Sequence, residues 1–200
     1  MPTAPQSLGR RERNKQAKLE RITAAASALF AEHGVDDVTT QQIAEAADIG
    51  AGTLFLYAKT KGELLLLVQN TLYVEALERG HAAASATASL PEAVLALITP
   101  IVECNRTQVD NGRTYLREMV FGDPTEPHHA EALSIVARTD EAMAAILTKH
   151  SSVDEPQALE LARVISAVMF VTMAASVNAG SSTEEILSSI RSQIAVILPR

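Results

Sequence analysis

The sequence predicts an all-α protein with about nine helices, and three observations support this fold class. Alanine, leucine and glutamate are abundant while turn-rich runs are few, a composition typical of helical domains. Apolar residues recur at three- and four-residue intervals, and no alternating strand pattern lasts beyond a few residues. Of the 200 residues, 47% are apolar but only 4% are aromatic, so we expect a sizeable, mainly aliphatic core.

The chain divides into three parts by composition and charge. Residues 1–12 are expected to form a disordered basic arm, residues 13–60 a small helical head, and residues 61–200 a larger helical body. The formal net charge is −7. Residues 1–61 hold eight basic and seven acidic residues, a net +1, whereas residues 62–200 hold nine basic and 17 acidic residues, a net −8. A near-neutral head with basic edges can bind phosphate while the acidic body stays clear of it.

The head is predicted to contain one long helix and two short ones. The long helix begins at Arg13 and stops at Gly34. Its apolar stripe consists of Ile22, Ala26, Leu29 and Phe30. Thr40 is expected to cap the first short helix, and Asp48 to end it, because aspartate tolerates the left-handed backbone of a tight turn. The inward residues of this short helix are Ile43, Ala44 and Ala47.

The second short helix is expected to run from about Ala51 to Tyr57. Gly50 is an acceptable cap for it, and Leu54 anchors it inward. Two short helices joined by a tight turn are the layout of a helix-turn-helix, whose second helix enters the major groove of DNA. The sequence therefore predicts a DNA-binding domain over residues 13–60.

The same stretch resembles the signature of the TetR family of bacterial transcriptional regulators. It reads I-A-E-A-A-D-I-G-A-G-T-L-F-L-Y-A-K-T-K-G-E-L-L, against a family pattern of roughly I-A-x-x-A-G-V-S-x-G-T-L-Y-x-Y-F-x-x-K-x-x-L. The matching residues are Ile43, Ala44, Ala47, Gly52, Thr53, Leu54, Tyr57, Lys61 and Leu64. The chain departs from the pattern at Asp48, Gly50, Phe55 and Ala58. The resemblance is specific over about residues 15–68 and implies a homodimeric regulator with an effector-binding body.

The second short helix has no arginine, asparagine or glutamine on its expected exposed face. That face comprises Ala51, Gly52, Thr53, Phe55 and Leu56. We expect it to read DNA by packing on thymine methyl groups, by a threonine hydroxyl and by close backbone approach. Phe55 and Leu56 could instead belong to the core, and we expect Phe55 to be the more buried of the two. Further DNA contacts are expected at Thr39, Thr40, Gln41 and Gln42, and the family resemblance adds Tyr57 and Lys61 as contacts to the DNA backbone.

The body is predicted to consist entirely of helices. These are expected over residues 61–80, 91–109, 114–121, 128–150 and 157–178, with a last helix from about residue 183. The breaks fall at the small-residue stretch 81–89, at Asn111–Gly112, at the proline-flanked stretch 122–127 and at 151–156. The 128–150 helix is expected to face inward through Leu133, Val136, Met143 and Leu147.

If the resemblance extends to the body, residues 81–180 hold a cavity for a small, largely apolar effector of unknown identity. Candidate wall residues are Val102, Cys104, Asn105, Tyr115, Met119, Phe121, Met143, Met169, Phe170 and Met173. Methionine adapts to ligands of varied shape, although core filling is an equally good reason for it. Arg106, Arg113 and Arg117 are expected on the surface, and one of them turned inward would indicate an anionic ligand.

One head makes too few DNA contacts for useful specificity, so a homodimer is expected. It would place two heads about 34–36 Å apart in successive major grooves. The 157–178 helix is apolar nearly all round, and the last helix carries a stripe of isoleucines, so together they are the predicted four-helix interface. The interface residues are Leu161, Val164, Ile165, Val168, Val171, Ile186, Ile190, Ile194 and Ile197. The alternative is that both helices lie in the core of one protomer.

No catalytic or cofactor site is evident in the sequence. Cys104 is the single cysteine, which excludes an internal disulfide and fits a reducing compartment. His128 and His129 could bind a metal, but no further cysteine or histidine follows at ligand spacing, so no role is assigned to them. The apolar run 164–175 is shorter than the roughly 20 residues that a membrane span needs, and no secretory signal is expected. We therefore predict a cytoplasmic protein without a membrane partner.

The function predicted in first place is a repressor that an effector releases from palindromic operator DNA. Two other classes stay open at this point: a DNA-binding or adaptor protein without an effector, and a helical enzyme. The basic stretch 10–18 has two readings as well, because it could contact phosphate or simply form a solvated tail.

Overall fold

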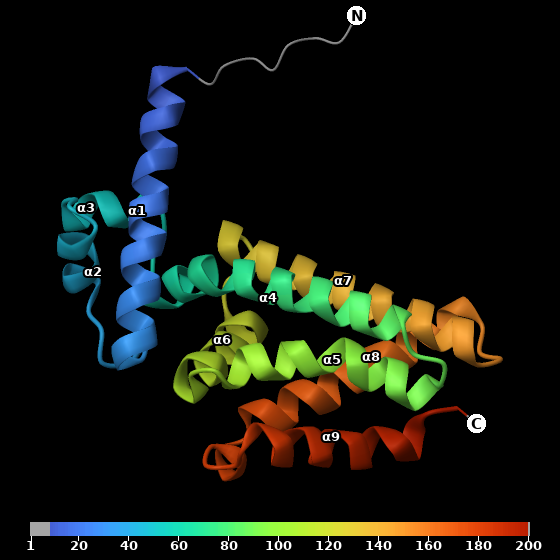
Figure 1. Ribbon diagram of the computed structural model, residues 1–200. Coiled ribbons are helices and arrows are strands. Elements are labelled where there is room, and N and C mark those ends of the chain that lie inside the picture. The colour runs from blue at the N-terminus through green and yellow to red at the C-terminus, as the bar shows by residue number, and fades with distance from the viewer. Residues whose placement is uncertain (1–8, 200) are drawn as a thin grey trace, which may run out of the picture.

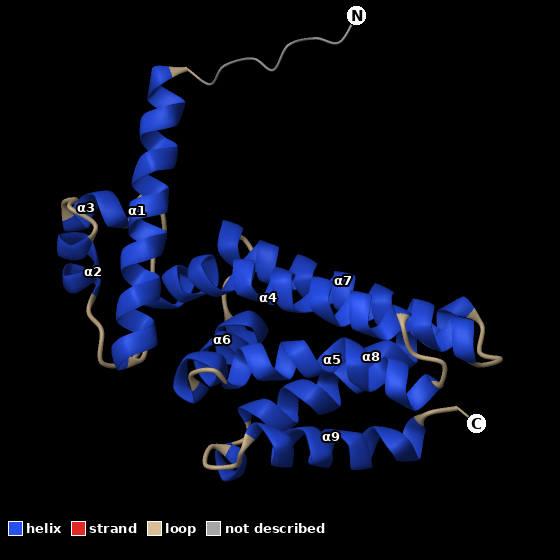
Figure 2. Cartoon of the chain, viewed as in Figure 1, coloured by secondary structure: helices blue, strands red, loops and turns tan. Residues whose placement is uncertain are grey.

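The computed structural model describes residues 9–199, and helices make up nearly all of this part of the chain (Figure 1). The elements are α1 (Arg10–His33), α2 (Thr40–Ala46), α3 (Ala51–Leu54), α4 (Lys61–Ser85), α5 (Leu90–Arg106), α6 (Val109–Phe121), α7 (Pro127–His150), α8 (Glu155–Ala174), a 3-10 turn η1 (Ser176–Asn178) and α9 (Thr183–Ile197). Within residues 9–199 there is no strand, which confirms the all-α prediction (Figure 2). The segment 1–8 of the predicted arm lies outside the described residues.

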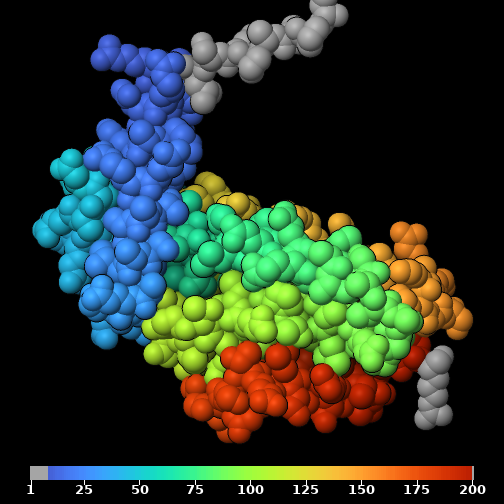
Figure 3. Space-filling view, viewed as in Figure 1, coloured from blue at the N-terminus to red at the C-terminus, as the bar shows by residue number. Residues whose placement is uncertain are grey.

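The head consists of α1, α2 and α3, and the body consists of α4 to α9. Helix α1 stands across the end of the body, with α2 and α3 packed on its outer side (Figure 1). In the space-filling view the head forms a lobe of its own at one end of the body, and α9 lies along the opposite edge (Figure 3). One continuous cluster of buried apolar residues runs from Ile22 in α1 to Ile194 in α9. The head is therefore joined to the body by packing as well as by the chain.

Helix α1 begins three residues earlier than predicted, at Arg10. Gly9 occupies the N-cap position with an extended backbone and no side-chain hydrogen bond. The polar residues that follow it are good helix formers, and Glu12 complements the positive end of the helix dipole. Residues 10–12 of the expected disordered arm are thus helical, which corrects the boundary at Arg13.

Two predicted breaks in the body are displaced, the first to residues 86–89 and the second to residues 107–108, because glycines at the predicted positions allow close helix packing. Helix α4 continues past Gly80, since a Cβ at this position would lie 2.1 Å from the Leu97 carbonyl oxygen of α5. Helix α6 includes Asn111 and Gly112, and a Cβ on Gly112 would lie 2.0 Å from the Asn105 carbonyl oxygen. These glycines allow two helices to pack closely and do not end a helix. A local sequence pattern does not distinguish between these two roles.

Three further boundaries and one burial prediction also differ. Helix α5 ends at Arg106, short of Val109, and α7 begins at Pro127. Helix α8 covers Glu155–Ala174, after which η1 replaces the predicted continuation to Asn178. Leu133 on α7 is exposed, although Met143 and Leu147 are buried as predicted.

Helix α8 is long and apolar enough to cross a bilayer by length and composition alone, unlike the shorter run judged from the sequence. It packs against α6, α7 and α9 in the body. Core helices of globular proteins pass the same test. The contacts with α6, α7 and α9 bury part of the apolar surface of α8, and its exposed valines are described below.

Replacement of Gly80 by alanine tests the close packing of α4 on α5. The added methyl group would overlap backbone atoms, which cannot turn away as a side chain can, so we expect a loss of about 1–3 kcal/mol in unfolding free energy. Thermal unfolding followed by circular dichroism should show a Tm several degrees lower. The matched control is Gly180→Ala, because nothing lies within 4 Å of a Cβ there. Equal Tm values for the two variants would contradict this packing.

Candidate nucleic-acid interface

Helix α2 is fixed at its start by a capping box. The Thr39 hydroxyl oxygen accepts a hydrogen bond from the Gln42 backbone N–H at 3.2 Å, and the Gln42 side-chain oxygen accepts one from the Thr39 backbone N–H at 2.8 Å. Thr39 is therefore the N-cap, and Thr40 is the first helical residue, which corrects the predicted cap. The reason is the glutamine three residues after Thr39, which can complete the reciprocal pair only from that position.

The turn between α2 and α3 has the predicted left-handed residue. Asp48 has a φ of 53°, the single non-glycine residue with a positive φ among residues 9–199. Its carboxylate accepts a hydrogen bond from the Arg21 guanidinium at 3.3 Å, so the turn is also tied to α1. Gly50 is the N-cap of α3 and offers no side-chain bond. The turn thereby aims α3 outward from the head.

Helix α3 is shorter than predicted, because regular α-helix ends at Leu54 and a turn carries the chain to Tyr57. Leu54 is buried and anchors the segment. Leu56 is 83% exposed and Phe55 is 46% exposed, so the expected order of burial holds. Gly52 is exposed, while Ala51, Thr53 and Tyr57 are half-buried. Gln41 and Gln42 are exposed on α2, and Gln41 donates a hydrogen bond to Glu45 at 2.7 Å.

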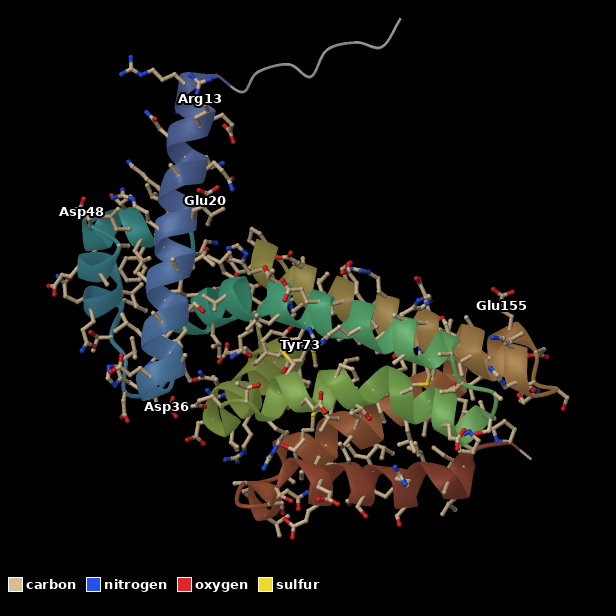
Figure 4. All side chains as sticks on the ribbon, in the orientation of Figure 1. Arg13, Glu20, Asp36, Asp48, Tyr73 and Glu155 are labelled. Atoms are coloured by element: carbon tan, nitrogen blue, oxygen red, sulfur yellow. The ribbon has the colours of Figure 1, made fainter. Side chains whose placement is uncertain are left out.

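A basic groove runs between the first half of α1 and the segment that follows α3. Its volume is about 940 Å³. It is lined by Arg10, Arg11, Glu12, Asn14, Lys15, Lys18, Thr53, Leu56 and Tyr57. The Tyr57 hydroxyl donates to the Lys15 carbonyl oxygen at 3.4 Å, which holds the two walls together. Figure 4 shows Arg13 at the outer end of α1, on the far side of the head from the body.

The groove brings together two groups of residues that were predicted separately from the sequence. The basic residues of α1 were predicted as an arm, and Leu56 and Tyr57 as parts of the reading segment. The structure places both along one groove, so a DNA backbone held by the arginines and lysines would bring base edges toward Leu56. The groove depends on how the segment after α3 lies against α1. The spacing of residues in the sequence does not predict this contact.

Lys61 has a structural role in addition to the predicted DNA contact. Its ammonium group donates to the carbonyl oxygens of Asp36 and Val38, at 3.1 and 3.2 Å. These bonds tie the start of α4 to the loop before α2. A lysine ammonium has three donors, so contact with a DNA phosphate stays a prediction that is compatible with this geometry.

Polar contacts also join the head to the body. The Asn111 amide accepts from the Val35 backbone N–H at 2.7 Å and donates to the Phe30 carbonyl oxygen at 2.8 Å, so α6 holds the end of α1. On the other side, the His128 ring nitrogen lies 2.9 Å from the Tyr57 carbonyl oxygen. Lys59 pairs with Glu126, and this carboxylate raises the pKa of Lys59.

The two histidines left without a role in the sequence thus have structural partners. His128 contacts the head, whereas the buried His129 ring lies 2.9 Å from the Met119 carbonyl oxygen in α6. Close by, Glu63 is buried with one carboxylate oxygen unpartnered, and burial raises the pKa of this group. The junction between α3, α4 and α7 is therefore a polar seam rather than an apolar one.

The predicted effector-wall residues separate into three groups. Tyr115, Met119, Met169 and Phe170 line a small inner cavity of about 20 Å³, where Tyr115 stacks on Tyr73 at a ring distance of 4.2 Å. Val102, Asn105, Met143 and Met173 are buried in the core. Phe121 is 82% exposed at the last turn of α6, and it lines the surface pocket of about 430 Å³ between α6 and α8 and not the inner cavity.

Cys104 borders a crevice of about 310 Å³ between α1, α4 and α5. Burial raises the pKa of its thiol to about 11, so little thiolate is present at neutral pH. Arg106 was expected at the surface but is buried. One terminal nitrogen of its guanidinium donates to the carbonyl oxygens of Ala179 and Ser181, while its Nε and its other terminal nitrogen are buried without a hydrogen-bond partner.

The predicted dimer-interface residues are divided between core and surface. Ile165, Ile186, Ile190 and Ile194 are fully buried within the protomer, which corrects their placement at an interface. The cause is that α9 packs its isoleucine stripe against α5 and α8 of its own chain. Leu161, Val168 and Ile197 are half-buried. Val164 and Val171 are 48% and 68% exposed, and they lie seven residues apart on the outer face of α8.

Comparisons with known proteins agree with this arrangement. Residues 22–68 match the family model described as bacterial regulatory proteins, tetR family. The fold is similar to Thermus thermophilus FadR, a TetR-family repressor solved with lauroyl-CoA, at 20% identity and a TM-score of 0.70, covering 90% of this chain and 93% of that one. A TetR regulator from Rhodococcus sp. RHA1 gives 17% identity and a TM-score of 0.68 over 92% and 96%.

A further similar structure is FadR from Bacillus subtilis, solved with stearoyl-CoA. It is 17% identical, with a TM-score of 0.62 over 90% of this chain and 97% of that chain. The comparison with curated proteins gave no match. At these identities the structural similarities show the fold of the whole chain, and the family model matches its N-terminal part.

An outward helix-turn-helix with a basic groove, carried on a larger helical body, defines a DNA-binding protein of two domains. Residues 22–68 match the tetR family of bacterial regulatory proteins, and the fold of the whole chain is similar to that of TetR-family regulators.

Two substitutions in the groove separate base reading from phosphate binding. Leu56→Ala should weaken binding to the cognate operator roughly tenfold and leave binding to random DNA unchanged, because an exposed apolar side chain contacts base methyl groups. Lys18→Gln should weaken binding to both DNAs and reduce the salt slope by about 1, because one phosphate contact is lost. Fluorescence anisotropy at several salt concentrations measures both effects. The reverse pattern would contradict this division of roles.

Proposed function

We propose that this chain is a homodimeric, ligand-responsive repressor that binds palindromic operator DNA in the cytoplasm. The observation that carries the proposal is the groove in which exposed Leu56 lies beside four basic residues of α1. Such a groove can hold the DNA backbone and present an apolar side chain to the bases at the same time. The predicted contacts at Thr39, Gln41, Gln42 and Gly52 are supported by the exposure of these residues.

Dimerisation is supported by the outer face of α8. Val164 and Val171 are exposed there, and Val196 of α9 is 83% exposed. Both helices belong to the body, and α9 lies along its lower edge (Figure 3). A two-fold contact through them would leave both heads accessible, and a palindromic operator would match the two-fold symmetry.

The response to a ligand would pass through the contacts between body and head. The Tyr115 hydroxyl, from the cavity wall, donates to Asn70 at 2.9 Å, and Asn70 donates to the His128 carbonyl oxygen at 2.9 Å. The His128 ring in turn contacts the Tyr57 carbonyl oxygen. A ligand that displaces Tyr115 would disturb this series of bonds and shift the head. The shift depends on the difference in ligand affinity between the two positions of the head.

A second candidate function follows from the size of the inner cavity. At about 20 Å³ it holds no more than a water molecule, so this cavity has no room for an effector in the described state. A DNA-binding protein that responds to no ligand would show the same cavity. The acyl-CoA ligands of the two FadR structures favour the ligand-responsive alternative, with an acyl compound as the first class to test.

Binding to DNA upstream of the chain's own gene tests the repressor proposal. A gel shift with excess random competitor should leave one specific complex, and a footprint should show two half-sites about 34–36 Å apart. Addition of the protein to a transcription reaction from that promoter should lower transcript yield. A complex that random DNA abolishes, or a higher transcript yield, would contradict the proposal.

The dimer contact can be tested with a charge on α8. Val164→Asp places a carboxylate in the proposed apolar seam, so we expect a monomer in sedimentation at micromolar concentration and at least a tenfold loss of operator affinity. Leu133→Asp, at an exposed leucine on α7, is the matched control and should stay dimeric. A dimeric Val164→Asp variant would exclude this face of α8 as the interface.

A further inference from the structure

Two neighbouring spaces in the body share a wall. A surface pocket of about 430 Å³ opens between α6 and α8, and a smaller inner cavity of about 20 Å³ lies beside the stacked Tyr73 and Tyr115. Leu116 and Phe170 line both spaces. These two side chains therefore form the wall shared by a larger outer pocket and a small inner cavity that is lined mostly by buried residues.

We propose that the outer pocket is the entrance to a binding site for an amphiphile with one anionic head group and an unbranched hydrocarbon tail, and that Leu116 and Phe170 form its gate. The tail would pass the gate into the inner cavity, and the head group would stay in the outer pocket. The inference rests on the proposed function, because it defines the ligand class and entry route of the effector site in that function.

The walls of the inner cavity favour a narrow apolar tail. Met119 and Met169 line it, and unbranched methionine side chains change conformation at low energetic cost. Phe170 is only half-buried and faces the open outer pocket, so it has space to turn away. A slender chain needs a smaller displacement of these side chains than a ring system does, which favours a linear tail.

The outer pocket supplies the group that would bind an anion. Arg113 and Arg117 lie one turn apart on α6 and both line it. Arg113 uses its Nε for the Ala174 carbonyl oxygen at 3.1 Å, which leaves its terminal nitrogens for other acceptors. Arg117 has the Glu118 carboxylate 3.6 Å away, an exposed pair of little strength. A guanidinium fork matches the geometry of a carboxylate or phosphate.

The acidic residues of the same pocket restrict the charge and position of the head group. Asp110 lies on α6 one turn before Arg113, and Asp36 comes from the loop between α1 and α2. Figure 4 shows Asp36 at the end of the head that adjoins the body. The two carboxylates would repel an anion from the side of the pocket next to the head and favour its position at the arginines. Repulsion from Asp36 also gives the bound anion a direct influence on the head.

Calorimetric titration of the full-length protein with dodecanoate, below the concentration at which it forms micelles, tests the ligand class. We expect saturable binding that strengthens by about fourfold for each methylene added from octanoate upward, until the inner cavity is full. Dodecanol and dodecyltrimethylammonium are the matched probes for the head group, and both should bind more weakly than dodecanoate. Equal affinity for the three head groups, or affinity independent of tail length, would overturn the proposal.

Substitutions in the pocket test its location. Arg117→Gln should lower dodecanoate affinity about fivefold and leave dodecanol affinity unchanged, because one charge-assisted hydrogen bond is lost. Arg191→Gln, on the exposed face of α9, is the matched control and should bind dodecanoate like the unsubstituted protein. Phe170→Trp enlarges the gate residue and should shorten the longest chain that still gains affinity, with its fold checked by thermal unfolding. If Arg117→Gln binds like Arg191→Gln, the head-group site is excluded, whatever Phe170→Trp does.

The gel shift described above separates this inference from the proposed function. A protein that binds its operator but shows no affinity for dodecanoate would overturn the amphiphile site and leave the DNA-binding role intact. A protein that binds dodecanoate as expected but has no operator would overturn the repressor proposal and leave the site in place.

Discussion

The arrangement of the molecule depends on how the end of α1 is held by the body. Asn111 accepts from the backbone N–H of Val35, just past the end of the helix, and donates to the carbonyl oxygen of Phe30, which the Gly34 N–H also bonds. Both bonds are buried, so their loss would leave polar groups desolvated at the junction. The same end of the head is held by Lys61, which bonds the carbonyl oxygens of Asp36 and Val38. The orientation of α3 relative to the body follows from these contacts.

The junction combines apolar packing with directed hydrogen bonds, and the hydrogen bonds suit a part that has to move. An apolar seam of the same extent would tolerate sliding in many directions, whereas directed hydrogen bonds allow few positions. Asn111 fixes one side of the head, and His128 with Lys59 fixes the other. The buried carboxylate of Glu63 lies at this second side, so the junction also contains a group whose ionisation is unfavourable there. A switch between two arrangements needs such discrete alternatives rather than a continuous range.

Much of the fold could be predicted from the sequence, because local signals and packing agreed. The left-handed Asp48, the buried Leu54 and the exposed Leu56 all followed from the spacing of the motif. The errors have tertiary causes. Gly80 and Gly112 interrupt no helix because a neighbouring helix occupies the space of a side chain. The isoleucines of α9 are buried by α5 and α8 of the same chain, and one sequence does not reveal whether an apolar stripe meets its own chain or another copy.

The position of Cys104 makes the crevice between head and body open to direct observation. It is the one thiol of the chain, it is half-buried, and burial keeps its pKa at about 11. Because thiolate is the species that alkylating reagents attack, the rate of alkylation at neutral pH reflects how often the crevice widens. A spin label attached there would give a single distance in a symmetric pair of chains, and this distance would change whenever the two bodies reorient.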